Sequence, residues 1–104
     1  MLLTEPNAWL HAVATLIVIF LSWWLQIDRI SFAFIMVAVV AVWMAEAFNT
    51  VLELTVDIVT SEQYSLAARR AKDIAAAAVL IATIGATLIG LIILGPPLLD
   101  HLGL

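Results

Sequence analysis

Hydrophobic residues fill three long stretches of the chain, and short polar segments separate them. The first stretch covers residues 8–25, where only His11, Thr15 and Ser22 interrupt the apolar pattern. A helix of this length would measure about 27 Å, which is just enough to cross the hydrocarbon core of a bilayer. We therefore predict a first membrane span there, followed by a polar reversal at residues 26–29.

The second stretch, residues 30–59, contains no glycine or proline that would break a helix. As a helix it would measure about 45 Å, which exceeds the roughly 30 Å hydrocarbon core. The third stretch covers residues 74–94, and Gly95-Pro96-Pro97 is expected to end its helix. The pattern thus predicts an all-α membrane protein with three transmembrane helices in a single domain over residues 1–104.

The composition agrees with a membrane protein and excludes several other classes. Of the 104 residues, 65% are hydrophobic, and eight acidic residues against four basic ones give a net charge of −4. Binding to nucleic acid is not expected, because phosphate contacts need a basic surface. The chain has no cysteine, which excludes disulfides, iron–sulfur clusters and thiolate zinc sites.

The second predicted helix carries a polar face that begins within its apolar part. Glu46, Asn49, Glu53 and Asp57 fall within about 80° of arc on a helix that turns about 100° per residue. Measured from residue 30, Glu46 would lie about 24 Å along the helix and Glu53 about 35 Å, so the face straddles a membrane surface. A charge at the bilayer centre costs about 2.5–3.5 kcal/mol, so acids within a span are functional candidates.

The most polar segment, residues 60–73, carries three of the four basic residues, Arg69, Arg70 and Lys72. By the positive-inside rule this connection is cytoplasmic, and the polar end of the second helix lies on the same side. The polar face is therefore predicted to meet the cytoplasm, where a lipid head group and a water-soluble reactant can meet.

Carboxylates at a membrane surface serve as metal ligands, as proton acceptors, or as relays for protons and ions. Glu53, near water, suits a hard cation such as Mg²⁺, whereas Glu46 lies deeper and suits a general base. Lys72 would neutralise phosphate charge, and Asp73 would orient a metal or a ribose hydroxyl. Together they fit phosphoryl transfer to a membrane alcohol, which depends on positioning and charge neutralisation.

An ion carrier would need acids near the bilayer midplane, whereas Glu46 lies closer to one edge.

Several other polar residues are interpreted as structural. Asp57 is interpreted as part of a solvated helix end, and Arg69 and Arg70 as topology signals. His11, near the start of the first span, is interpreted as a packed or interfacial histidine rather than a ligand.

The polar face also matches a family pattern. Glu46-Ala-Phe-Asn49-Thr-Val-Leu-Glu53, followed by Asp57 and then by Ala-Lys72-Asp, forms the pattern ExxNxxxExxxD joined to AKD. This pattern resembles the prokaryotic diacylglycerol kinase family, whose members are small trimeric membrane lipid kinases and include undecaprenol kinases. The resemblance extends over about residues 5–94.

The resemblance implies a lipid kinase that transfers the γ-phosphate of ATP to a lipid hydroxyl, with Mg²⁺ as cofactor. Glu46 would be the catalytic base, and Glu5 and Glu53 would hold Mg²⁺ with ATP. Diacylglycerol, converted to phosphatidic acid, is the expected acceptor, and undecaprenol is the alternative acceptor. The implied nucleotide contacts are Asn49, Glu53, Glu62, Lys72 and Asp73.

The resemblance further implies a homotrimer in the bacterial cytoplasmic (inner) membrane, with active sites between subunits on the cytoplasmic side. Family members carry a longer amphipathic segment before the position of Glu5, whereas four residues precede Glu5 in this sequence. This difference leaves an alternative open, namely a non-catalytic, truncated membrane protein that keeps the kinase fold.

Overall fold

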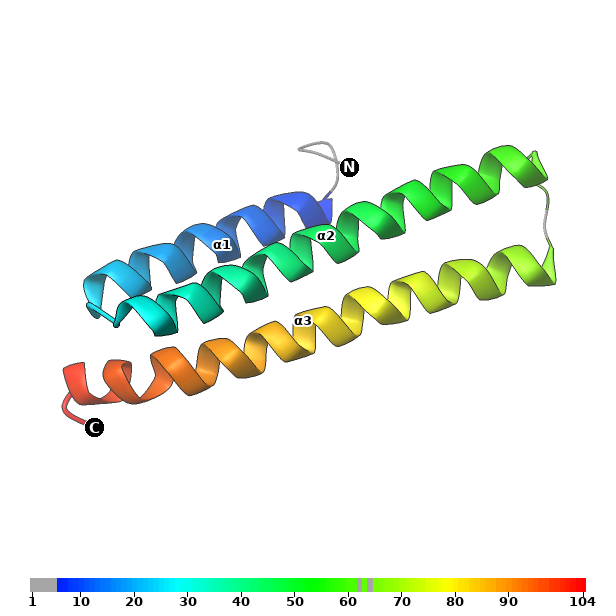
Figure 1. Ribbon diagram of the computed structural model, residues 1–104. Helices are drawn as coiled ribbons and strands as arrows, with labels where there is room; N and C mark the ends of the chain where they lie inside the picture. The colour runs from blue at the N-terminus through cyan, green and yellow to red at the C-terminus, as the bar shows by residue number, and fades with distance from the viewer. Residues whose placement is uncertain (1–5, 62, 64) are drawn as a thin grey trace.

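The computed structural model describes residues 6–61, 63 and 65–104, and these residues form three α-helices joined by short connections (Figure 1). Helix α1 spans Pro6–Trp24, α2 spans Arg29–Thr60 and α3 spans Leu66–His101. Successive helices run in opposite directions in an elongated bundle that measures 56 × 23 × 22 Å. Two predicted site residues, Glu5 and Glu62, lie outside the described residues.

The helices have the length and composition of membrane spans. The most apolar windows of α2 and α3 have mean hydropathy values of 2.2 and 2.6, and both helices are long enough to cross a bilayer. Helix α1 contributes a shorter apolar segment, Ala8–Trp24. No strand occurs in the part of the chain that the structure describes. The predicted all-α membrane protein with three transmembrane helices is therefore confirmed.

The outer surface of the bundle is strongly apolar. Large side chains such as Phe34, Ile81 and Leu91 are exposed along α2 and α3, and Trp9 and Trp23 are exposed near the two ends of α1. Such a surface is stable against lipid tails or further protein, and not against water. Within the described residues, the buried hydrophobic side chains are Ala8, Ile35, Ala38, Val42 and Leu94.

The reversal between α1 and α2 comes from local backbone chemistry. Gln26 adopts a left-handed conformation with a φ angle of 53°, which turns the chain after α1. Asp28 then caps α2 by accepting hydrogen bonds from the hydroxyl and the backbone N–H of Ser31, at 2.6 and 3.0 Å. These bonds stabilise the ionised carboxylate and hold the pKa of Asp28 below its usual value.

Helix α3 begins at Leu66, well before the predicted start at residue 74. The polar segment had been expected to connect the spans, but alanine, leucine, arginine and lysine are all strong helix formers whatever their polarity. The side chain of Ser65 accepts a hydrogen bond of 3.1 Å from the backbone N–H of Ala68 and caps this first turn. Lys72 therefore lies inside α3 rather than at its start.

Helix α3 also continues beyond its predicted end, through Pro96 and Pro97 to His101. The prediction that Gly95-Pro96-Pro97 would end the helix is wrong. A proline removes one backbone donor, but leaving the helix in an apolar environment would expose several unpaired backbone groups. The last turn is also held by a tertiary contact, because the ring of His101 packs edge-on against Trp24 with centroids 4.2 Å apart.

The helices do not cover one another equally. Helix α2 packs chiefly against α3, and α1 lies along only part of α2, so that α2 and α3 project together beyond the start of α1 (Figure 1). Residues of α1, α2 and α3 also line an apolar cleft of about 380 Å³, with His11 and Trp43 among its lining residues. The polar face described below begins beside α1 at Glu46 and continues onto the projecting part of α2.

The cap at Ser65 provides a test of the observed start of α3. We expect Ser65→Ala to lower the free energy of unfolding by about 1 kcal/mol, because the N–H of Ala68 loses its acceptor. Thermal unfolding of the detergent-solubilised protein, followed by circular dichroism, measures this loss. Ser65→Thr keeps the hydroxyl and should stay closer to the unsubstituted protein, so an equal loss in both variants would contradict the cap.

Candidate functional site

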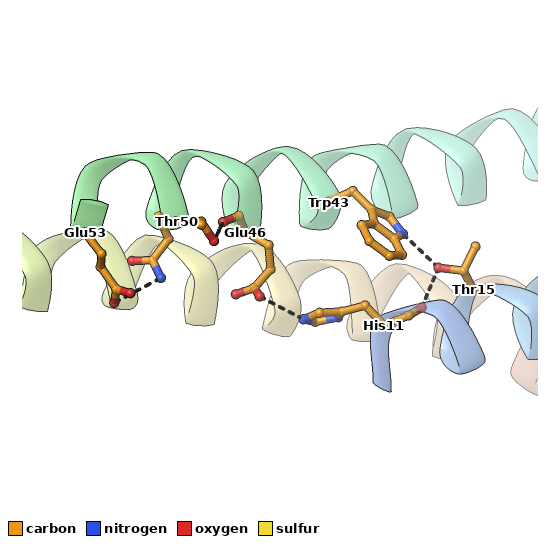
Figure 2. Close-up of polar contacts among 7 residues, drawn as sticks. His11, Thr15, Trp43, Glu46, Thr50 and Glu53 are labelled. Atoms are coloured by element: carbon orange, nitrogen blue, oxygen red, sulfur yellow. Dashed lines mark hydrogen bonds and ion pairs between the residues drawn. The ribbon is translucent and has the colours of Figure 1, made fainter. Parts of the chain in front are cut away.

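The polar face of α2 is continuous. Glu46, Asn49, Glu53 and Asp57 all lie within α2, which runs unbroken from Arg29 to Thr60. Their spacing keeps them on one side of the helix, as predicted. Figure 2 shows Glu46 and Glu53 on the same side of α2, with Glu46 near α1 and Glu53 further along.

Glu46 meets the first helix through a histidine. The Nε2 atom of His11 lies 3.8 Å from Oε2 of Glu46, and the two side chains are only 16% and 13% exposed. Figure 2 shows the two side chains pointing toward one another from α1 and α2. The backbone carbonyl of Glu46 also accepts a hydrogen bond of 3.0 Å from the hydroxyl of Thr50. The face therefore begins at a mostly buried His–carboxylate pair.

A second link between α1 and α2 lies one turn earlier. The indole Nε1–H of Trp43 donates a 3.0 Å hydrogen bond to Oγ1 of Thr15, and the hydroxyl of Thr15 donates a 2.7 Å bond to the carbonyl of His11 (Figure 2). The rings of His11 and Trp43 also face each other at 6.1 Å between centroids, with a tilt of 59°. These contacts fix α1 against α2 beside Glu46.

Asn49 and Glu53 form the middle of the face. The amide Nδ2 of Asn49 lies 3.5 Å from Oε1 of Glu53, which is a long hydrogen bond. Oδ1 of Asn49 is buried and accepts no hydrogen bond from the described residues. The Glu53 side chain is exposed. This part of the face thus offers a solvent-accessible carboxylate and an unpaired amide oxygen, both hard oxygen donors.

At the far end of the face, α2 and α3 are joined by a charge pair. Nζ of Lys72 lies 2.5 Å from Oδ1 of Asp57, and the side chains are 36% and 38% exposed. The interpretation of Asp57 as simply part of a solvated helix end is therefore wrong, because Lys72 reaches it from the neighbouring helix. A pair of this exposure is partly screened by water, but it fixes where the ammonium group lies.

Asp73 lies close to this pair and is more exposed. Its carboxylate is 3.9 Å from Nε of Arg69, and the side chains of Asp73 and Arg69 are 73% and 67% exposed. Asp57, Lys72 and Asp73 nevertheless line the same cavity of about 360 Å³ between the ends of α2 and α3. The structure thus brings the predicted residues of α3 to the same end of the bundle as Glu53.

The predicted metal site has one ligand, Glu53, among the described residues. Glu5, one of its two ligands, lies outside the described residues, as does the predicted nucleotide contact Glu62. Among the described residues, no group of three histidine, aspartate or glutamate side chains is close enough to hold a metal ion. The pairing of Glu5 with Glu53 therefore stays a prediction.

His11 packs against Trp43, as its interpretation as a packed or interfacial histidine implies, but its closeness to Glu46 was not predicted. A signal for this closeness lies in the helix order. Counting equal numbers of residues away from the reversal at 26–29 places His11 opposite Met44, within one turn of Glu46. The helix order and the residue count alone therefore place the ionisable side chain of the first span near the deepest acid of the second.

The chain matches a known protein family. The family model of prokaryotic diacylglycerol kinase matches residues 1–94. A diacylglycerol kinase of Synechocystis is 36% identical over 97 residues, which cover 93% of this chain and 55% of that protein. The chain thus spans about half the length of that relative. No solved structure shows a significant match.

Two other relatives are covered more fully. An undecaprenol kinase of Bacillus subtilis is 34% identical over 91% of this chain and 76% of its own length. A diacylglycerol kinase of Escherichia coli K12 is 38% identical over 81% of this chain and 68% of its own length. These matches extend across the polar face of α2 and the start of α3, and the chain belongs to the prokaryotic diacylglycerol kinase family.

Proposed function

We propose that the protein is a lipid kinase that transfers the γ-phosphate of ATP to the hydroxyl of a membrane lipid. The observation that carries this proposal is the graded polar face of α2. It begins at a mostly buried Glu46 and reaches the exposed Glu53 and the Asp57–Lys72 pair where α2 and α3 project. Such a face can meet a lipid hydroxyl at one end and a water-soluble nucleotide at the other.

Glu46 is proposed as the general base. Its carboxylate is only 13% exposed, so a lipid hydroxyl held there would meet few competing water molecules. Glu46 would take the proton of the hydroxyl as the lipid oxygen attacks the γ-phosphorus. The bond from that phosphorus to the β,γ-bridging oxygen would break, and ADP would leave with the electron pair. The products are a lipid phosphate and ADP.

Glu53 is proposed to hold Mg²⁺ together with ATP, with Glu5 as the second carboxylate. The oxygen donors at Glu53 and Asn49 fit a hard divalent cation, and the exposed position of Glu53 admits a nucleotide from water. A bound Mg²⁺ would neutralise phosphate charge that builds up during transfer. Asn49, with its unpaired Oδ1, is proposed to contact the nucleotide from the same face of α2.

Lys72 and Asp73 are proposed to bind the phosphates and the nucleoside, together with Glu62. Lysine is a common phosphate ligand, because its ammonium group acts as a compact positive charge. The contact with Asp57 holds that charge between α2 and α3, next to the cavity that Asp73 also lines. Asp57 would thus keep the ammonium group directed into the nucleotide site.

The acceptor and the assembly are proposed from the family. Diacylglycerol is the proposed acceptor, with undecaprenol as the second candidate, following the names of the relatives.

A homotrimer in the bacterial inner membrane, with its sites on the cytoplasmic side, is consistent with the basic start of α3 and the apolar surface of the bundle. Within the described residues, α1 lies along only part of α2, and a neighbouring subunit would complete the site.

Glu46→Gln tests the proposed base. It should abolish transfer of labelled phosphate from ATP to diacylglycerol and undecaprenol, lowering kcat by about 100-fold or more, because the amide cannot accept the proton. ATP binding should change little, since the side-chain shape is kept. Asp100→Asn, at the opposite end of the bundle, is the matched control and should keep its activity. Normal turnover in the Glu46→Gln variant would exclude the proposed role.

Glu53→Gln tests the proposed metal ligand. The apparent affinity for Mg²⁺ in the kinase assay should fall about tenfold, because a carboxylate ligand is replaced by a neutral amide. Activity should recover in part at high Mg²⁺ concentration. The measurement is the rate as a function of free Mg²⁺ at saturating ATP. An unchanged Mg²⁺ dependence would argue against ligation by Glu53.

Lys72 and Asp57 can be tested together in a double-mutant cycle. Lys72→Met should raise the KM for ATP about tenfold through loss of a charged phosphate contact. Asp57→Asn should raise it less, and the double variant should be no worse than Lys72→Met alone, because Asp57 acts through Lys72. Arg70→Gln removes a neighbouring exposed charge and serves as the control. Independent, multiplicative effects of the two substitutions would contradict the proposed link.

A further inference from the structure

We propose that His11 is a positioning residue for Glu46: its imidazole Nε2–H holds the carboxylate on the α1 side of α2, in the orientation from which it accepts the lipid proton. This inference rests on the proposed role of Glu46 as the general base. It adds a residue from α1 to a site whose other described members belong to α2 and α3.

The geometry favours a directed contact over incidental packing. Nε2 of His11 and Oε2 of Glu46 are 3.8 Å apart, and both side chains are mostly buried. Among the described residues, His11 is the one ion-pair partner of the Glu46 carboxylate. The separation is longer than a hydrogen bond, and such contacts commonly tighten when a substrate closes the site.

Glu46 needs such a partner for two physical reasons. A carboxylate that is only 13% exposed loses hydration, and a nearby donor offsets part of that cost. Glutamate also has three rotatable side-chain bonds, so the carboxylate of an unpartnered Glu46 would sample several directions. A general base must come within about 2.6–3.2 Å of its proton donor. A Glu46 carboxylate that is not held in one orientation would meet this condition less often, and turnover would fall.

The imidazole of His11 is itself held in place from α2. The ring faces Trp43, which precedes Glu46 by about one turn of the same helix. The indole of Trp43 also binds Thr15, whose hydroxyl binds the carbonyl of His11 (Figure 2). Helix α2 therefore carries both the carboxylate and the aromatic ring that orients its partner. The position of His11 relative to Glu46 follows from the packing of two helices rather than from a mobile loop.

The test compares His11→Leu with His11→Gln in the phosphate-transfer assay. His11→Leu removes the donor, and we expect kcat to fall about 10- to 100-fold while the KM for ATP stays within about twofold. His11→Gln restores a side-chain N–H at similar reach, and its kcat should lie within a few-fold of the unsubstituted enzyme. A purely structural histidine would give no such split between kcat and KM and no rescue by glutamine.

His101→Leu is the matched control, because His101 also contacts a tryptophan but lies at the opposite end of the bundle. It should keep its kcat even where its unfolding temperature falls as much as that of His11→Leu. Unchanged kcat in His11→Leu, or an equal loss in the glutamine and leucine variants, would overturn the positioning role. Active Glu46→Gln would instead overturn the proposed base, so the two failures are distinguishable.

Discussion

A carboxylate on an apolar helix needs a polar partner, and this requirement organises the structure around Glu46. Lipid offers no hydrogen bonds, so an acid near the boundary must meet protein groups or reach water. Here the side chain is mostly buried and faces His11 across the α1–α2 contact. The Trp43–Thr15 hydrogen bond fixes the same contact one turn away. The packing of α1 on α2 is thus set beside the acid that we propose as the base.

The polar face is more exposed beyond Glu46, and the two proposed roles, proton acceptance and metal–nucleotide binding, divide along it. The Glu46 side chain is 13% exposed and that of Asp57 is 38% exposed, about three turns further on. A base that removes a proton from a lipid benefits from exclusion of water, whereas a metal–nucleotide complex arrives from water. One unbroken helix can serve both, because its axis crosses from lipid to the aqueous boundary.

Much of the fold followed from hydropathy, because long apolar runs in lipid have few alternatives to helix. The polar face was also predictable, since its spacing is a property of α2 alone. The extent of α3 was not predictable from polarity or proline content, because a polar segment need not be a connection and a proline need not end a helix. Residues 66–73 are helix formers behind a serine cap, and Pro96 and Pro97 are accommodated within the helix.

Contacts between helices were harder to predict than the helices themselves. Asp57 was expected to face solvent, yet Lys72 reaches it from α3. That pair depends on where α3 begins, so the error in one boundary concealed the contact. His11 was expected only to pack, and its distance from Glu46 depends on the register of α1 against α2. Both contacts are properties of two helices together, and neither has a signature in either helix alone.

Because α2 and α3 are longer than the hydrocarbon core is thick, membrane thickness affects how deep the residues of the site lie. Their 32 and 36 residues correspond to about 48 and 54 Å, against a hydrocarbon core of about 30 Å. Tilting shortens the span along the membrane normal, so thickness and tilt together set how far the ends emerge. A thicker bilayer would draw Glu46 deeper into hydrocarbon, and a thinner one would bring it toward head groups and water. Hydrophobic mismatch would thereby tune the hydration of the acid that begins the polar face.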